Sequence, residues 1–113
     1  MSDAELHPTL REALAQPGDP SATPVERQKP EEARAEFLAD IAAVDGPKPE
    51  VRETVELALA GSVGPLAARL YMPATLDDGA SAVMLYFHGG GNIRGGIETH
   101  DSTARVLANA GGI

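Results

Sequence analysis

Residues 82–96 read AVMLYFHGGGNIRGG, and this stretch decides the fold. Its first part, Ala82 to Phe87, is apolar without alternation, which is typical of a strand buried on both faces in a parallel sheet covered by helices. A glycine-rich loop follows, and a helix is predicted from near Thr99 or His100 to a stop at Gly111. The sequence therefore predicts a strand, a glycine-rich loop and a helix in succession, within an α/β fold.

The loop has the composition of an anion site, because glycines and a helix N-terminus direct backbone N–H groups toward a negative atom. Its spacing disfavours nucleotide binding. A dinucleotide fingerprint that starts at Gly89 meets Arg94 where glycine is required, and a P-loop would need lysine at the position of Gly96. What fits is His-Gly-Gly-Gly directly after a buried strand, a motif that supplies an oxyanion-hole donor in lipases and esterases. Such N–H groups stabilise the anion that forms when a nucleophile attacks an ester carbonyl.

Residues 51–113 resemble the N-terminal part of the hormone-sensitive-lipase-like group of the α/β-hydrolase family. The resemblance rests on MLYFHGGG at 84–91, Gly95 and ETHD at 98–101, with support from RLYMP at 69–73. It implies an incomplete α/β-hydrolase fold, with a helical cap-like segment over 1–46 and the N-terminal part of a hydrolase domain over 47–113. The implied function is a serine ester hydrolase, carboxylesterase- or lipase-like, that acts on short- or medium-chain acyl esters.

The resemblance also implies roles in the loop. The N–H groups of Gly90 and Gly91 are the expected oxyanion donors, Gly89 shapes the turn, and His88 organises the loop and is not the general base. Asn92 stands where the family has an aromatic residue. Gly96 similarly replaces a small polar residue. These two departures bear on substrate preference and leave the fold unaffected.

Three other polar residues near the loop invite interpretation. His100, beside Asp101, is expected to cap and pack at the start of the helix. Arg94 is expected to be solvated, with contact to an acidic substrate as the alternative. A metal site from His88, His100 and Asp101 is disfavoured because their spacing is not compact, and no cofactor is expected.

The nucleophile is missing from the sequence. No serine stands in a Gly-x-Ser-x-Gly elbow, and the acid and base histidine that follow it in chain order are missing too. We therefore expect an N-terminal piece that is inactive alone, and that is aggregation-prone or partly folded because Val83 to Phe87 lacks a neighbouring strand. The alternatives are a non-catalytic module that binds a carboxylate or docks on a full-length homologue, and an inactive truncated product.

The rest of the chain predicts helices over 7–15 and 30–44, and a helix start at the capping-box sequence TPVE, 23–26. Two alternating runs, 53–60 and 66–72, predict an antiparallel hairpin in which Val55, Leu57 and Leu59 share a half-buried face, and a turn is expected at 77–79. The helix over 30–44 carries an apolar stripe that is interpreted as its buried face or, alternatively, as the lining of an acyl pocket: Phe37, Leu38, Ile41 and Val44.

Composition narrows the class of partner. The 113 residues hold 9 Lys and Arg against 17 Asp and Glu, a net charge of −8, which argues against a nucleic-acid surface. The absence of cysteine excludes disulfides, thiolate zinc sites and a cysteine nucleophile. No apolar stretch is long enough to span a membrane and no secretory signal is visible, so we expect a cytoplasmic protein. The resemblance implies that its partner is a small-molecule ester. The oligomeric state is left open.

Overall fold

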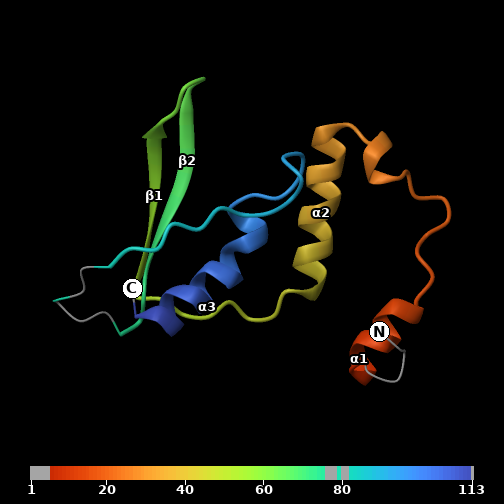
Figure 1. The fold of residues 1–113 in the computed structure, drawn as a ribbon, viewed down its shortest axis with the longest axis horizontal. Coiled ribbons are helices and arrows are strands. Elements are labelled where there is room, and N and C mark those ends of the chain that lie inside the picture. The colour runs from red at the N-terminus through yellow and green to blue at the C-terminus, as the bar shows by residue number, and fades with distance from the viewer. Residues whose placement is uncertain (1–5, 76–78, 80–81, 113) are drawn as a thin grey trace.

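The computed structural model describes residues 6–75, 79 and 82–112. The radius of gyration is 17.6 Å, whereas a compact domain of this length has about 13 Å, so the arrangement is open. Ala33, Pro73 and Ala108 are the buried apolar residues of the described part. In chain order the elements are α1 (Pro8–Ala15), the 3₁₀ turn η2 (Val25–Arg27), α2 (Pro30–Val44), β1 (Glu53–Ala60), β2 (Pro65–Met72), the 3₁₀ turn η3 (Glu98–His100) and α3 (Asp101–Gly111) (Figure 1).

The hairpin predicted from the alternating runs is confirmed. β1 and β2 pair antiparallel, from Glu53 opposite Met72 to Ala60 opposite Pro65. The expected half-buried face is right for Val55 and wrong for Leu57 and Leu59, which are exposed. The reason is that only the Met72 end of β2 lies against α3, while the turn end extends away from the helices (Figure 1). Of the expected turn at 77–79, Asp77 and Asp78 lie outside the described residues.

The helices follow their local signals. α1 and α2 each begin with proline in the first turn, where a missing N–H costs nothing. The covered face of α2 consists of Ala33, Phe37 and Ile41, spaced four apart. The predicted stripe is therefore wrong in two members, since Leu38 and Val44 are exposed. The fully buried member, Ala33, has a side chain too small to register as part of an apolar stripe.

The predicted capping box at 23–26 does not form. Pro24 is the N-cap of a single 3₁₀ turn and makes no side-chain capping bond. The turn cannot grow into a helix because Pro30 follows closely, and the residue before a proline is driven to extended backbone. Lys29 is accordingly extended at ψ 148°, and its N–H donates to Glu32 Oε2 at 3.2 Å.

Residues 82–87 do not form the predicted buried strand. They are assigned to no strand, and the sheet of the described part holds β1 and β2 alone. Exposure nevertheless alternates along the run: Val83, Leu85 and Phe87 are 76, 78 and 83% exposed, and Met84 and Tyr86 are 45 and 46% exposed. The run therefore has the two-residue period of a strand without the hydrogen-bonded neighbour that would complete one. The expected lack of a neighbouring strand therefore holds for the described residues, whereas the expected burial on both faces does not.

Candidate functional site

The loop after residue 87 is held by hydrogen bonds to one carbonyl group, that of Gly90. The Gly90 carbonyl accepts hydrogen bonds from the N–H of Ile93 at 3.2 Å and from the N–H of Arg94 at 3.0 Å. The backbone turns through positive φ at Gly90 (138°), Gly91 (63°), Asn92 (61°) and Gly95 (91°). Asn92 is a residue type that tolerates the left-handed conformation.

Two of the glycines are required by close backbone approach. A Cβ on Gly90 would lie 1.8 Å from the Arg94 carbonyl oxygen. A Cβ on Gly95 would lie 2.7 Å from the Gly89 carbonyl oxygen and 3.1 Å from His88 Nδ1. Gly91 differs, because a Cβ there would meet no atom within 4 Å and only its φ favours glycine.

The N–H groups of Gly90 and Gly91 are available in this loop. Within the described residues neither donates a hydrogen bond, whereas the Gly90 carbonyl is engaged twice. All described peptide bonds are trans, so a carbonyl and the N–H of the next residue point in opposite directions. Since the Gly90 carbonyl faces into the turn, the Gly91 N–H faces out of it. The arrangement can therefore present N–H groups to an anion.

The two histidines near the loop lie against each other. The rings of His88 and His100 stack with centroids 5.3 Å apart, and His88 Nδ1 lies 2.8 Å from the Gly89 carbonyl oxygen. Thr99 closes the other end of the loop: its Oγ1 accepts from the Gly96 N–H at 2.9 Å and lies 2.9 Å from His100 Nδ1. Across the described ranges, no group of three or more His, Asp or Glu side chains could hold a metal ion.

Helix α2 holds the loop from its other side. The Arg34 Nε donates to the Ile93 carbonyl at 2.7 Å. The Arg94 guanidinium carbon lies 4.9 Å from the centroid of the Phe37 ring, a cation–π contact. Arg94 is half-buried, so the expectation of a solvated side chain is wrong: the apolar face of α2 gives its guanidinium an aromatic surface to cover.

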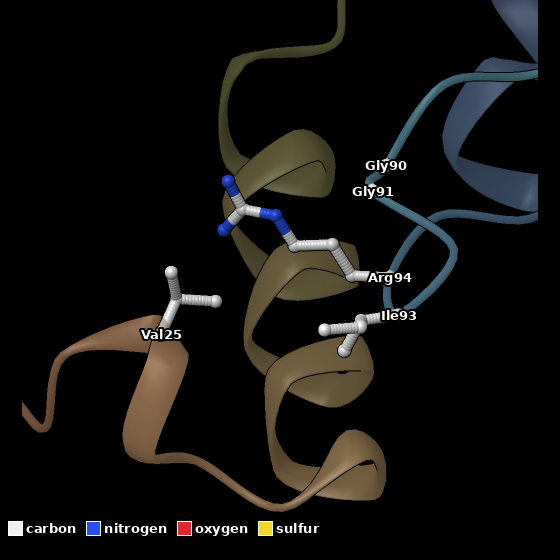
Figure 2. Close-up of a pocket in the computed structure, with 5 residues that line it drawn as sticks. All are labelled: Val25, Gly90, Gly91, Ile93 and Arg94. Atoms are coloured by element: carbon white, nitrogen blue, oxygen red, sulfur yellow. The ribbon is translucent and has the colours of Figure 1, made fainter.

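A shallow hollow of about 290 Å³ opens beside the loop (Figure 2). Gly90, Gly91, Ile93 and Arg94 form one side, and Val25 from η2 lies across from them. Sequence reasoning missed Val25 because it stands in a short irregular segment without periodicity. The hollow places apolar side chains and one cation next to Gly90 and Gly91.

A buried carboxylate anchors the helix that follows the loop. Asp101 is 1% exposed, and its oxygens accept from Lys48 Nζ (2.8 Å), Arg69 Nη1 (2.9 Å), Tyr71 Oη (2.7 Å) and Arg105 Nε (2.8 Å). We call these five residues the Asp101 cluster. It ties the first residue of α3 to β2 and to the segment before β1. Sequence reasoning placed Asp101 at a helix start, but its four partners lie 4 to 53 positions away along the chain, so no local pattern indicated its burial.

The Asp101 cluster perturbs three ionisable groups. Burial would raise the pKa of Asp101, but the hydrogen bonds from Lys48, Tyr71, Arg105 and Arg69 outweigh it and hold that pKa well below its usual range. Burial, with the bond to Asp101, raises the pKa of Tyr71 to about 12. The pKa of Arg69 is raised, chiefly by Glu98, which accepts from Nη2 at 2.6 Å, and also by Glu56. Asp101 and Arg69 therefore stay charged, and Tyr71 stays neutral, through neutral pH.

No family model matches the chain. Among curated proteins, the esterase LipI of Mycobacterium tuberculosis is 52% identical over 61 residues, which are 53% of this chain and 19% of the relative. The ethyl acetate hydrolase of Pseudomonas putida is 34% identical over 92 residues, 80% of this chain and 29% of the relative. The chain thus spans between about a fifth and three tenths of these relatives' lengths.

Solved structures of an esterase and of an α/β-hydrolase enzyme also superpose on most of this chain. An esterase of Pyrobaculum calidifontis superposes with a TM-score of 0.66 at 29% identity, over 92% of this chain and 32% of that one. An α/β-hydrolase enzyme from the metagenome of Lake Arreo gives 0.62 at 31% identity, over 89% of this chain and 31% of that one. These likenesses confirm both the resemblance and the fold class that the sequence predicts.

Proposed function

We propose that this chain, from its likeness to the hormone-sensitive-lipase-like group of α/β-hydrolases, carries the oxyanion loop of a serine ester hydrolase. In such an enzyme a serine attacks the ester carbonyl, an acyl-enzyme forms, and water releases the acid. The N–H groups of Gly90 and Gly91 stabilise the negative oxygen in both steps. Gly89 shapes the turn, and His88 holds it through its contacts with the Gly89 carbonyl and His100.

The observation that carries this proposal is the pair of free N–H groups. Had they been bonded to neighbouring carbonyls, no donor would be left for a substrate oxygen. Instead the turn is satisfied through the Gly90 carbonyl, and within the described part of the chain both N–H groups lack a partner. Donors that are already oriented lower the barrier without reorganising during the reaction.

The substrate we propose is a small ester of a short- or medium-chain acid. The hollow beside the N–H groups is small, about 290 Å³, and is lined by the apolar side chains of Val25 and Ile93. The name of one relative, ethyl acetate hydrolase, supports an ester of this size.

We also propose a cytoplasmic location, which cell fractionation tests. In the described residues, no helix is both long and apolar enough to cross a membrane.

The 113 residues alone are proposed to be inactive, because none of their serines stands in a nucleophile elbow. Two measurements test these proposals. A nitrophenyl-ester assay on the chain is expected to give no turnover above background. Titration of ¹⁵N-labelled chain with ethyl methylphosphonate, an anionic mimic of the tetrahedral intermediate, is expected to shift the amide signals of Gly90 and Gly91.

Saturable hydrolysis by the chain itself would contradict the assignment of the nucleophile to a part outside this sequence. Unmoved Gly90 and Gly91 signals at millimolar phosphonate would contradict the oxyanion role. The alternative is a module that only binds carboxylates. It predicts the same amide shifts, but no Gly-x-Ser-x-Gly sequence in the coding region beyond Ile113, so reading that region separates the two.

A further inference from the structure

We infer that Arg94 makes the hollow selective for esters that carry a carboxylate, so that half-esters of short dicarboxylic acids bind there in preference to neutral esters. The inference rests on the proposed function for the position of the ester carbonyl at Gly90 and Gly91. The inference adds a second contact with the substrate, between the side chain of Arg94 and the carboxylate of the half-ester.

Among the residues that the structure describes, Arg94 has no anionic partner of the kind that Arg69 and Arg105 have. Arg69 and Arg105 both bind Asp101. For Arg94, within the described residues, the structure gives a contact with the Phe37 ring and no carboxylate. The chain holds 17 acidic residues against 9 Lys and Arg, so an arginine left without an acid is not explained by a shortage of acids. A guanidinium drawn partly out of water has an unfavourable desolvation energy that an anionic ligand would offset.

The ring contact leaves the hydrogen-bonding capacity of Arg94 unused. A guanidinium that stacks on an aromatic face keeps its N–H groups in its own plane, where they can bind a carboxylate through two parallel bonds. Figure 2 shows the Arg94 side chain extending from the loop across α2, toward the side on which Val25 lies. Arg34 adds a second positive charge from α2 at the same loop, where its Nε binds the Ile93 carbonyl.

The chemistry of the lining then defines the ligand. The ester carbonyl oxygen lies at the N–H groups of Gly90 and Gly91, a short carbon chain lies against Ile93 and Val25, and a carboxylate at the far end binds Arg94. A neutral ester of the same length keeps the first two interactions and loses the third. The difference between these two ligands isolates the contribution of the cation.

Binding to the 113-residue chain tests the inference. ¹⁵N-labelled chain is titrated with monoethyl glutarate and, separately, with neutral diethyl glutarate, and the Gly90 and Gly91 amide signals are followed. We expect the half-ester to bind about tenfold more tightly, a difference of about 1.4 kcal/mol. Arg94→Gln should make the two affinities about equal, because it weakens the binding of the half-ester and leaves the binding of the diester unchanged. The control Arg52→Gln removes an exposed arginine outside the hollow and should leave the preference unchanged.

A second measurement does not require that the chain fold alone. The 113 residues replace the corresponding part of the esterase LipI, so that Val25, Phe37 and Arg94 are all retained, and kcat/KM is measured for the nitrophenyl half-ester of glutarate and for nitrophenyl butyrate. The ratio of the two values on one preparation is independent of the fraction folded. We expect the ratio to fall about tenfold with Arg94→Gln.

The possible outcomes distinguish a failure of the inference from a failure of the proposed function. Equal binding of both ligands, with shifts at Gly90 and Gly91, overturns the inference and leaves the proposed function standing. A half-ester preference that survives Arg94→Gln overturns the assignment to Arg94. If neither ligand moves the two glycine signals and the hybrid enzyme is inactive on both substrates, the proposed function and the inference fall together.

Discussion

Asp101→Asn tests how the end of the loop is held in place. The substitution keeps the size of the side chain and removes its charge, which leaves Lys48, Arg69 and Arg105 around a neutral amide. Breaking a fully buried ion pair from one side costs about 3–5 kcal/mol. Here the three cations are 45, 16 and 20% exposed and can partly rehydrate, so we expect a cost at or below the low end of that range.

A loss of about 2–3 kcal/mol lowers the hydrogen-exchange protection of the α3 amides by about 30- to 150-fold, since each 1.4 kcal/mol is a factor of ten. The assay is amide exchange followed by NMR at neutral pH. Glu98→Gln is the matched control: it also removes a carboxylate that pairs with Arg69, but that side chain is 56% exposed, so the expected cost is below about 1 kcal/mol. If α3 amides in Asp101→Asn exchange within threefold of those in Glu98→Gln, the Asp101 cluster does not anchor the helix.

Four further predictions follow from the same geometry. The pKa of Asp101 is depressed in the folded chain, so the ionised carboxylate stabilises the fold above the usual aspartate pKa of about 4, and this stabilisation is lost as the pH falls below about 4. Between pH 6 and pH 2, the melting temperature should therefore fall more steeply in the wild type than in Asp101→Asn. The phenol of Tyr71, with a pKa of about 12, should ionise above the usual value, measured as the difference in absorbance at 295 nm between wild type and Tyr71→Phe; half-ionisation near pH 10 would contradict its bond to Asp101. Gly90→Ala should disrupt the loop, because its Cβ would overlap the Arg94 carbonyl, whereas Gly91→Ala should cost only about 1–2 kcal/mol for its positive φ; equal spectral changes in the two variants would be inconsistent with the close approach. Leu85→Lys, in the more exposed row of residues 82–87, should reduce light scattering by the isolated chain more than Met84→Lys in the less exposed row. Strong amide protection from Val83 to Phe87 in a cooperatively melting monomer would refute the expected tendency to aggregate.

The sequence predicted those elements whose signals are local. α2 begins and ends where its proline and its Asp-Gly-Pro stop indicate, and the hairpin has the predicted pairing because two alternating runs flank a short turn. The loop was also predictable, since His-Gly-Gly-Gly after an apolar run is a specific pattern.

Features that depend on distant residues were not predictable. The burial of Asp101 needs Lys48, Arg69 and Tyr71, which the segment before β1 and strand β2 bring to it. The strand at 82–87 was predicted from its apolar side chains, but a strand also needs a neighbour for its backbone. Arg94 lies on Phe37 through the packing of the loop on α2, which no spacing in the sequence records.

The small apolar core has a thermodynamic consequence. Ala33, Pro73 and Ala108 have the buried apolar side chains of the described part, and the fully buried Asp101 is charged. Heat capacity rises on unfolding mainly in proportion to the apolar surface that becomes hydrated. We therefore expect calorimetry of this chain to give a heat-capacity increment below the usual 12–15 cal/mol/K per residue. Its stability should therefore vary weakly with temperature. It should vary more strongly with ionic strength, because salt screens the ion pairs between the partly exposed cations and Asp101.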